Sequence, residues 1–207
     1  ADPADLVPFD TGKADGHLFD PNHVIDDFAF EDGTLLDEGE IQAFLESTPY
    51  GRRSPLADLV LDDGRSVAAH MADASTTFNI SPLVLLTRMQ VEQGLISAQG
   101  TLPYHRLEKA LGCGCPDDSW CISALAGLST QLVCAAGLLR GYLEDLDLGD
   151  TTITGWKVGV SKESMDDVAV TPANRATAAL YTYTPWALPY EGGNWLFRNV
   201  YLKFSQY

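Results

Sequence analysis

The longest nearly apolar stretch of the chain covers residues 80–96, and its pattern predicts a buried helix. Ser81 is a preferred residue at the N-cap of a helix, and Pro82 suits the first helical position. Gly94 is typical of the residue that follows a helix end. Neither glycine nor proline interrupts the residues between Pro82 and Gly94, so we expect one continuous helix there.

One carboxylate, Glu92, lies on the apolar side of this predicted helix. It shares helical spacing with Leu85, Met89 and Ile96. An ionised carboxylate is expensive to bury, so a glutamate in this position tends to stay protonated and is suited to donating a proton. The negative end of the helix dipole disfavours the anion further. The alternative is a Glu92 that reaches solvent or pairs with Arg88, one turn earlier.

The other patterns predict a mainly α protein (α+β) with a small β-hairpin. Capping signals and apolar spacing predict helices over residues 38–47, 66–78 and 122–148, the last of them long or kinked. Thr171 and Pro172 predict the start of a helix that ends before Pro185, and the aromatic C-terminal segment predicts a final helix. Residues 151–170 are rich in β formers and predict the hairpin.

Length and composition limit the classes of protein that the chain can be. With 207 residues it can bury the core of one domain. Residues 1–22 are rich in Asp, Gly and Pro, which predicts a leader or linker before a single domain over residues 23–207. No run of about 18 apolar residues predicts a membrane span. The formal charge of −16 argues against a nucleic-acid partner, whose phosphates require a basic face.

Four cysteines lie close together in the sequence, at Cys113, Cys115, Cys121 and Cys134. Their spacing lacks the paired C-x2-C pattern of zinc sites and encloses no histidine, so we expect two disulfides and no metal or cofactor. Cys113 and Cys115 are poor partners for each other. Two pairings remain, 113–134 with 115–121, or 113–121 with 115–134. Disulfides form in oxidising compartments, so the protein is expected to be exported.

Three blocks of sequence, ISPLVLLTRMQVEQGLI, LGCGCPDDSWC and ATAALYTYTPW, resemble in order and spacing a group of secreted actinobacterial and related proteins in the lysozyme-like superfamily. The resemblance extends from about His23 to the C-terminus. It implies a lysozyme-like helical fold related to goose-type lysozymes and lytic transglycosylases. In those proteins a glutamate at the end of a buried helix faces a sugar cleft, and this glutamate falls on Glu92.

The cysteine loop and the residue after Glu92 differ from the pattern of that group. Lytic transglycosylases usually have Ser after the catalytic glutamate, where this chain has Gln93, and Cys113 replaces a tyrosine. The Cys115–Cys121 bridge is usual in the group. Cys113 and Cys134 therefore look like an added pair, which supports the first of the two pairings.

Cleavage of a glycosidic bond requires an acid that protonates the leaving oxygen and a group that stabilises or traps the cation-like centre. Glu92 is the predicted general acid. Asp117 and Asp118, on the disulfide-pinned loop, are the candidates for the second carboxylate, and Asp117 is the predicted one because it matches the CPD pattern of the group more closely. Ordinary turn chemistry is the alternative role for Asp117. Resemblance to lytic transglycosylases also implies a mechanism in which the N-acetyl group or 6-hydroxyl of the substrate replaces a second carboxylate.

Five further residues are predicted to bind substrate: Gln93, Gln131, Tyr181, Tyr183 and Thr184. The resemblance places the two tyrosines along the cleft, where aromatic faces stack on sugars. Tyrosines in the core and glutamines on the surface are the alternatives.

The sequence thus predicts a monomeric bacterial glycoside hydrolase or lytic transglycosylase that is secreted, periplasmic or at the cell surface. Its expected partner is a polysaccharide, peptidoglycan or a related β-1,4-linked amino-sugar polymer. A hydrolase of chitin or chitosan is one alternative, because the negative charge of the chain is repelled by anionic wall polymers. A non-catalytic glycan-binding domain is another, because a fold does not dictate function.

Overall fold

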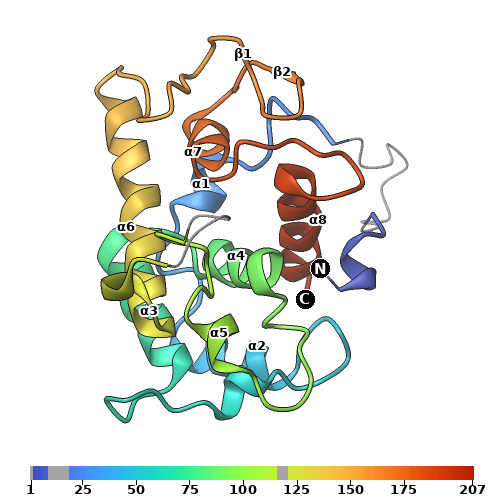
Figure 1. Cartoon of the computed structure of the whole chain (residues 1–207), viewed down its shortest axis with the longest axis vertical. Coiled ribbons are helices and arrows are strands. Elements are labelled where there is room, and N and C mark those ends of the chain that lie inside the picture. The colour runs from blue at the N-terminus through green and yellow to red at the C-terminus, as the bar shows by residue number, and fades with distance from the viewer. Residues whose placement is uncertain (1, 9–18, 116–120) are drawn as a thin grey trace. The chain divides into compact units, whose positions relative to one another are not determined.

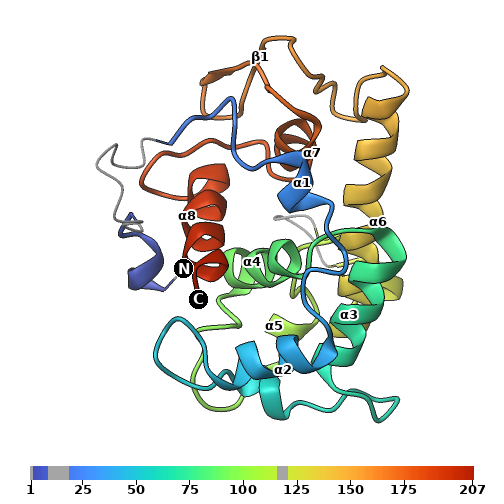
Figure 2. The same ribbon diagram turned by 180° about the vertical axis from the view of Figure 1, so that it is seen from behind.

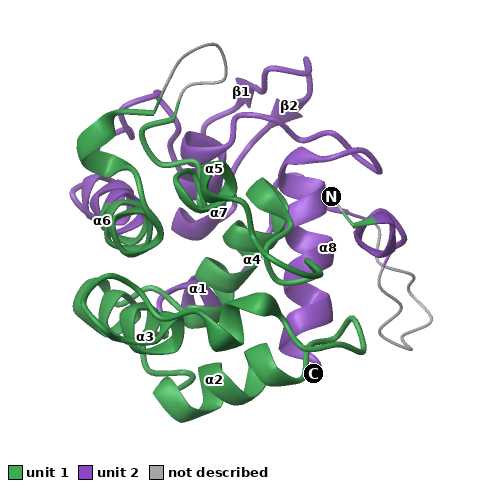
Figure 3. Ribbon diagram, turned by 60° about the horizontal axis from the view of Figure 1, so that its bottom comes forward, with its two compact units in different colours: residues 1–2, 32–137, 207 green, residues 3–31, 138–206 purple. Residues whose placement is uncertain are grey.

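The computed structural model describes residues 2–8, 19–115 and 121–207. Within these ranges the protein is mainly helical and has one small two-stranded antiparallel sheet, as predicted (Figure 1). The chain divides into two compact units (Figure 3). Unit 1 comprises residues 1–2, 32–137 and 207, and unit 2 comprises residues 3–31 and 138–206. No helix in the described ranges is both long enough and apolar enough to cross a membrane.

Unit 1 contains the helices that lead to the predicted glutamate. Its elements are α2 (Glu38–Glu46), η2 (Pro55–Asp58), α3 (Val67–Phe78), α4 (Pro82–Gln93), α5 (Tyr104–Leu107), η3 (Ser123–Leu125) and the first part of α6 (Leu128–Asp147). α3 packs against both α2 and α4, and Figure 2 shows these three helices from behind. Their buried residues, including Leu45, Met71 and Leu85, form the apolar core of the unit.

Local capping explains where α2 and α3 begin. At α2 the side chain of Asp37 accepts from the backbone N–H of Glu40, and the side chain of Glu40 accepts from the N–H of Asp37, both at 2.8 Å. At α3 the Oγ atom of Ser66 accepts from the N–H of Ala69 at 3.0 Å. These bonds satisfy N–H groups that have no partner inside a helix. Both helices occur where the sequence predicts them.

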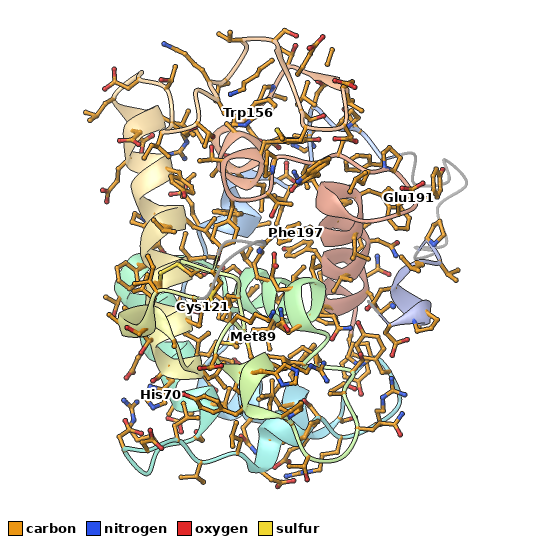
Figure 4. All side chains as sticks on the ribbon, in the orientation of Figure 1. His70, Met89, Cys121, Trp156, Glu191 and Phe197 are labelled. Atoms are coloured by element: carbon orange, nitrogen blue, oxygen red, sulfur yellow. A yellow bond between two sulfur atoms is a disulfide. The ribbon has the colours of Figure 1, made fainter. Side chains whose placement is uncertain are left out.

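The predicted buried helix is confirmed as α4. It follows Ser81, begins at Pro82 and ends before Gly94, which adopts a left-handed conformation with φ of 58°. Every residue from Pro82 to Gln90 is buried, and Met89 marks this helix in Figure 4. α4 is therefore enclosed on all sides over most of its length, and its side chains reach a surface only in the last turn.

Unit 2 combines helices with the small sheet. Its elements are η1 (Pro3–Asp5), α1 (Asp27–Phe30), the remainder of α6, β1 (Lys162–Glu163), β2 (Ala169–Val170), α7 (Arg175–Tyr183) and α8 (Gly193–Ser205). In the sheet Lys162 lies opposite Val170. The buried side chains of Trp156 and Phe197, labelled in Figure 4, belong to the core of this unit.

Part of the segment predicted as a leader packs on α8. The ammonium group of Lys203 donates to the carbonyl of Ala4 at 2.8 Å and to the carboxylate of Asp5 at 2.9 Å. The amide of Asn199 donates to the carbonyl of Val7 at 2.9 Å. Asp5 is buried, so η1 is part of the packed structure of unit 2.

Two predicted helix starts are wrong, the first because of a local turn at a glycine and the second beside a contact from a distant segment. α6 begins at Leu128 and not at residue 122, because Gly127 has φ of 99° and η3 precedes it. α7 begins at Arg175, after the N-cap Asn174, and not after Thr171. The N–H of Thr171 donates instead to the side chain of Asn22 at 2.6 Å.

The predicted hairpin exists but is shorter than its β-rich sequence suggests. The run ITGWKVGV, residues 153–160, contains turns and no strand, and pairing is confined to two residues on each side. Trp156 is drawn into the core there, its ring centroid 4.9 Å from that of Tyr181. Burial of this one large side chain outweighs the weak preference of the run for a regular strand.

Candidate active site

Glu92 lies in the last turn of α4, where the enclosed helix reaches a pocket. Its side chain is 27% exposed, in contrast to the buried residues before it. The pocket has a volume of about 340 Å³. All of the lining residues belong to unit 1, and most of them have polar side chains. They are Asp2, Glu92, Gln93, Gly94, Ser97, Ala98 and Arg106. The structure thus places the carboxylate of Glu92 on the lining of a pocket.

The nearest charged partner of Glu92 is Arg88, one turn earlier on the same helix. The guanidinium group of Arg88 donates to the Oε1 atom of Glu92, and the Arg88 side chain is only 1% exposed. The alternative in which Glu92 pairs with Arg88 is therefore observed. This contact attaches the buried guanidinium group of Arg88 to the carboxyl group of Glu92 in the pocket lining.

A second arginine, Arg106, closes the C-terminal end of α4. Its Nε atom donates to the carbonyl of Gln93 and its Nη2 atom to the carbonyl of Gly94, both at 3.0 Å. The last carbonyls of a helix have no partner within it, and a cation is favourable at this end of the helix dipole. Arg106 thus fixes the backbone that follows Glu92 and adds a positive charge to the pocket.

Another part of the lining is held by a short chain of hydrogen bonds that starts on α4. The buried side-chain amide of Gln90 accepts from the N–H of Ser97 and donates to its Oγ atom, both at 3.0 Å. The carbonyl of Ser97 accepts from the Nε atom of Arg52 at 2.9 Å. The Nη2 atom of Arg52 donates to the carboxylate of Asp2 at 2.6 Å. A second carboxylate is therefore held in the lining.

The cysteine loop is anchored by two disulfides and by one buried amide. The disulfides join Cys113 to Cys134 and Cys115 to Cys121, the pairing that the resemblance supports. Figure 4 labels Cys121. On α6, Gln131 accepts from the N–H of Cys113 at 3.0 Å and donates to its carbonyl at 2.6 Å. Gln131 is fully buried, so its amide organises the loop from within.

Gly112, in this loop, lies against the carboxylate of Glu92. Its φ of 78° is in the left-handed region, which favours glycine. A Cβ atom at this position would lie 3.1 Å from the Oε2 atom of Glu92. The absence of a side chain therefore lets the loop backbone approach the carboxylate. Sequence reasoning missed Gly112, although a glycine beside the bridged cysteines was a visible signal.

The remaining predicted site residues are distributed between the pocket and the other unit. Gln93 contributes to the pocket lining. Tyr181, Tyr183 and Thr184 belong to unit 2. Tyr181 is fully buried against Trp156, and this burial raises the pKa of its hydroxyl group. Their roles in substrate binding, like that of Gln131, stay predictions.

Asp117 and Asp118 lie outside the described residues. Three polar residues of the lining, Asp2, Ser97 and Arg106, were missed by sequence reasoning. Asp2 was assigned to the leader, and Ser97 and Arg106 follow α4 in segments without a strong periodic pattern. No local motif predicts that a side chain so far along the chain, such as Arg106, returns to cap α4.

Comparison of the chain with protein-family models, curated proteins and solved structures produced no match. The functional argument therefore rests on the chemistry of the Glu92 pocket and on the resemblance of the sequence motifs.

Proposed function

We propose that the protein is an exported enzyme of lysozyme-like fold that cleaves a β-1,4-linked amino-sugar polymer, with Glu92 as the general acid. The observation that carries this proposal is the partly exposed carboxylate of Glu92 on the wall of a polar pocket, at the end of a helix that is otherwise buried. The disulfide-linked loop beside it supports a rigid site, and export is consistent with the two disulfides.

In the proposed reaction the bond between the anomeric carbon and the leaving oxygen breaks, and the leaving oxygen takes the proton of Glu92. Negative charge then develops on the carboxylate of Glu92. The guanidinium group of Arg88 already donates to this carboxylate, so it stabilises the charge as it forms. The role of Arg88 is electrostatic, and the proton moves only between Glu92 and the sugar.

Peptidoglycan is the substrate that the sequence motifs favour, and chitin or chitosan is the alternative. The net charge of −16 distinguishes them, because an acidic protein repels anionic wall polymers and attracts cationic chitosan. Salt screens both interactions. Activity on chitosan should therefore fall as the ionic strength rises, and activity on an anionic polymer should not.

The direct test of the proposed function is Glu92→Gln. This change keeps the size of the side chain and removes the proton donor, so release of soluble saccharides from purified peptidoglycan should fall by about 10² to 10⁴ fold. Glu46→Gln is the matched control, because Glu46 also pairs with an arginine, Arg53, at 3.3 Å but lies on α2 outside the pocket. Undiminished release by a correctly folded Glu92→Gln protein would rule out the assignment.

A non-catalytic glycan-binding domain is the second candidate, and the ion pair between Arg88 and Glu92 favours it. In that case Glu92 is retained because it neutralises a buried cation. The domain would bind amino-sugar oligomers in calorimetry without releasing products. Glu92→Gln would then lower the melting temperature, and neither the wild-type protein nor the variant would cleave the polymer.

A further inference from the structure

Gly112 brings the backbone of the cysteine loop against the carboxyl group of Glu92. A Cβ atom at position 112 would lie 3.1 Å from the Oε2 atom of Glu92, 3.3 Å from its Cδ atom and 3.8 Å from its Cγ atom. These three atoms would be its nearest neighbours, apart from residues 111 and 113. The space that a side chain would need at this position is therefore next to the carboxyl group of the predicted general acid.

The two oxygens of this carboxyl group have different surroundings. The guanidinium group of Arg88 donates to the Oε1 atom of Glu92, whereas the Oε2 atom is the one nearest to the missing side chain of Gly112. A proton on Oε1 would be repelled by the positively charged N–H group that points at this oxygen. The neutral form of Glu92 therefore carries its proton on Oε2, the oxygen beside Gly112.

The loop backbone is kept in place because both neighbours of Gly112 are anchored to α6. The Oε1 atom of the buried Gln131 accepts from the N–H of Leu111 at 3.2 Å and from the N–H of Cys113 at 3.0 Å. Cys113 is also bridged to Cys134, one turn further along the same helix. Buried hydrogen bonds that are satisfied fix the direction of the groups they join. The backbone at residue 112 is thus held from both sides.

We propose that Gly112 is a positioning residue for the general acid, and this inference rests on the proposed function. Because it has no side chain, Oε2 of Glu92 keeps its place while Arg88 holds Oε1. A methyl group at 3.1 Å would be closer than the optimal contact distance of about 3.5 Å, so it would push Oε2 aside by a fraction of an ångström. The carboxyl group would then turn, and its proton would no longer point at the leaving oxygen.

The first experiment compares Gly112→Ala with Gly127→Ala in the full chain, using soluble peptidoglycan fragments as substrate. Gly127 is the matched control because it also has a left-handed conformation, with φ of 99°, but a Cβ atom there would meet no atom within 4 Å. Misplacement of a reacting group by 1 Å can cost about 10² fold in rate, so the smaller shift in Gly112→Ala should lower kcat by about 10 fold. KM should change less than about twofold, and Gly127→Ala should match the wild type within about twofold.

The second experiment distinguishes a misplaced acid from a damaged fold. It uses 2,4-dinitrophenyl β-glycosides of the same fragments, in which the phenolate leaves with the electron pair of the broken bond and takes no proton. Gly112→Ala and Glu92→Gln should both keep kcat on these glycosides within about threefold of the wild type, because no general acid is required. An equal loss by Gly112→Ala on both kinds of substrate would overturn the positioning role, since a damaged fold slows both.

If Gly112→Ala does not fold, Gly112→Asn takes its place in both experiments. Asparagine adopts the left-handed conformation more readily than alanine and adds the same Cβ atom beside Glu92. Folding of each variant is measured by circular dichroism and thermal melting before the rates are compared.

The outcomes separate this inference from the proposed function. If Gly112→Ala is as active as Gly127→Ala while Glu92→Gln is inactive on the natural fragments, the general acid stands and Gly112 does not position it. If Glu92→Gln is as active as the wild type, or the wild type does not turn over, the proposed function fails and the role of Gly112 fails with it.

Discussion

Two buried glutamine amides hold loops near the Glu92 pocket in unit 1, whereas in unit 2 one arginine holds a cluster of carboxylates together. In unit 1 Gln90 and Gln131 are both fully buried, and each forms directional hydrogen bonds to backbone groups of a following or preceding loop. In unit 2 Arg175 binds three carboxylates, those of Asp27, Glu31 and Asp147.

The two kinds of contact differ in how closely they fix the position of the chain. A buried amide has fixed donor and acceptor directions and is costly to leave unsatisfied, so it defines the position of a loop closely. A partly exposed ion pair tolerates more variation in geometry and is weakened by solvent. The segments at Ser97 and Cys113, next to the candidate site, are therefore held by the more restrictive of the two interactions.

The largest effect on stability is expected from Gln131→Leu, which removes one of the two buried amides of unit 1. Leucine cannot replace the bonds to the N–H groups of Leu111 and Cys113 or to the carbonyls of Cys113 and Leu125. Several buried backbone groups would lose their partners, so the free energy of unfolding should fall by about 3 to 4 kcal/mol in urea titrations.

The control for Gln131→Leu is Gln42→Leu, because the amide of Gln42 bonds to the exposed Glu46 and to one carbonyl, that of Ala57. This change should cost less than about 1 kcal/mol. Equal costs for the two variants would contradict the special role of buried amides in unit 1.

A smaller effect is expected from Arg175→Met in unit 2. Burial disfavours the charge of this arginine, but the attraction of Glu31, Asp27 and Asp147 outweighs it and raises the pKa of Arg175. Its removal leaves three carboxylates facing one another, while Arg140 still pairs with Glu31 at 3.1 Å. We expect a loss of about 2 kcal/mol in the free energy of unfolding.

Arg53→Met is the comparison for Arg175→Met, since Arg53 binds Glu46 and Asp58 on the surface of unit 1. Surface pairs contribute about 0 to 1 kcal/mol, so this variant should lose at most that amount. High salt should reduce the difference between the two variants. If Arg175→Met loses no more free energy of unfolding than Arg53→Met, the charge cluster of unit 2 contributes no more than ordinary surface pairs.

The smallest effect concerns the pH dependence of unit 2 through Asp166. Burial raises the pKa of this carboxyl group, but hydrogen bonds from the N–H groups of Ala187 and Leu188, both at 2.8 Å, outweigh it and leave the pKa below its usual value. A lowered pKa stabilises the folded state fully above the unfolded-state pKa of about 4. That stability is lost as the pH falls through the lower pKa of the folded state.

Asp166→Asn should therefore be less stable than the wild type by about 1 kcal/mol at pH 7, and the difference should shrink as the pH falls from 5 to 2. Urea unfolding at several pH values measures this difference. A gap that stays constant down to pH 2 would show that ionisation of Asp166 does not stabilise unit 2.

Local sequence signals determined the helices whose ends are fixed by nearby residues. α2 has its capping box, α3 its serine cap, and α4 its proline start and glycine end, all within a few residues of the ends that they set. The position of Glu92 at the end of a buried helix follows from the same short-range periodicity. The two disulfides could also be expected, because the four cysteines are close in sequence.

Only the tertiary structure decided the starts of α6 and α7 and the composition of the pocket. Asn22 binds Thr171 across most of the chain, and Gly127 and Gln131 shape the turn before α6. Asp2 joins the pocket of Glu92 through Arg52, although no periodic pattern relates these residues. The physical reason is the same in each case. Backbone propensity is worth fractions of a kcal/mol per residue, so one hydrogen bond or ion pair from outside the segment can override it.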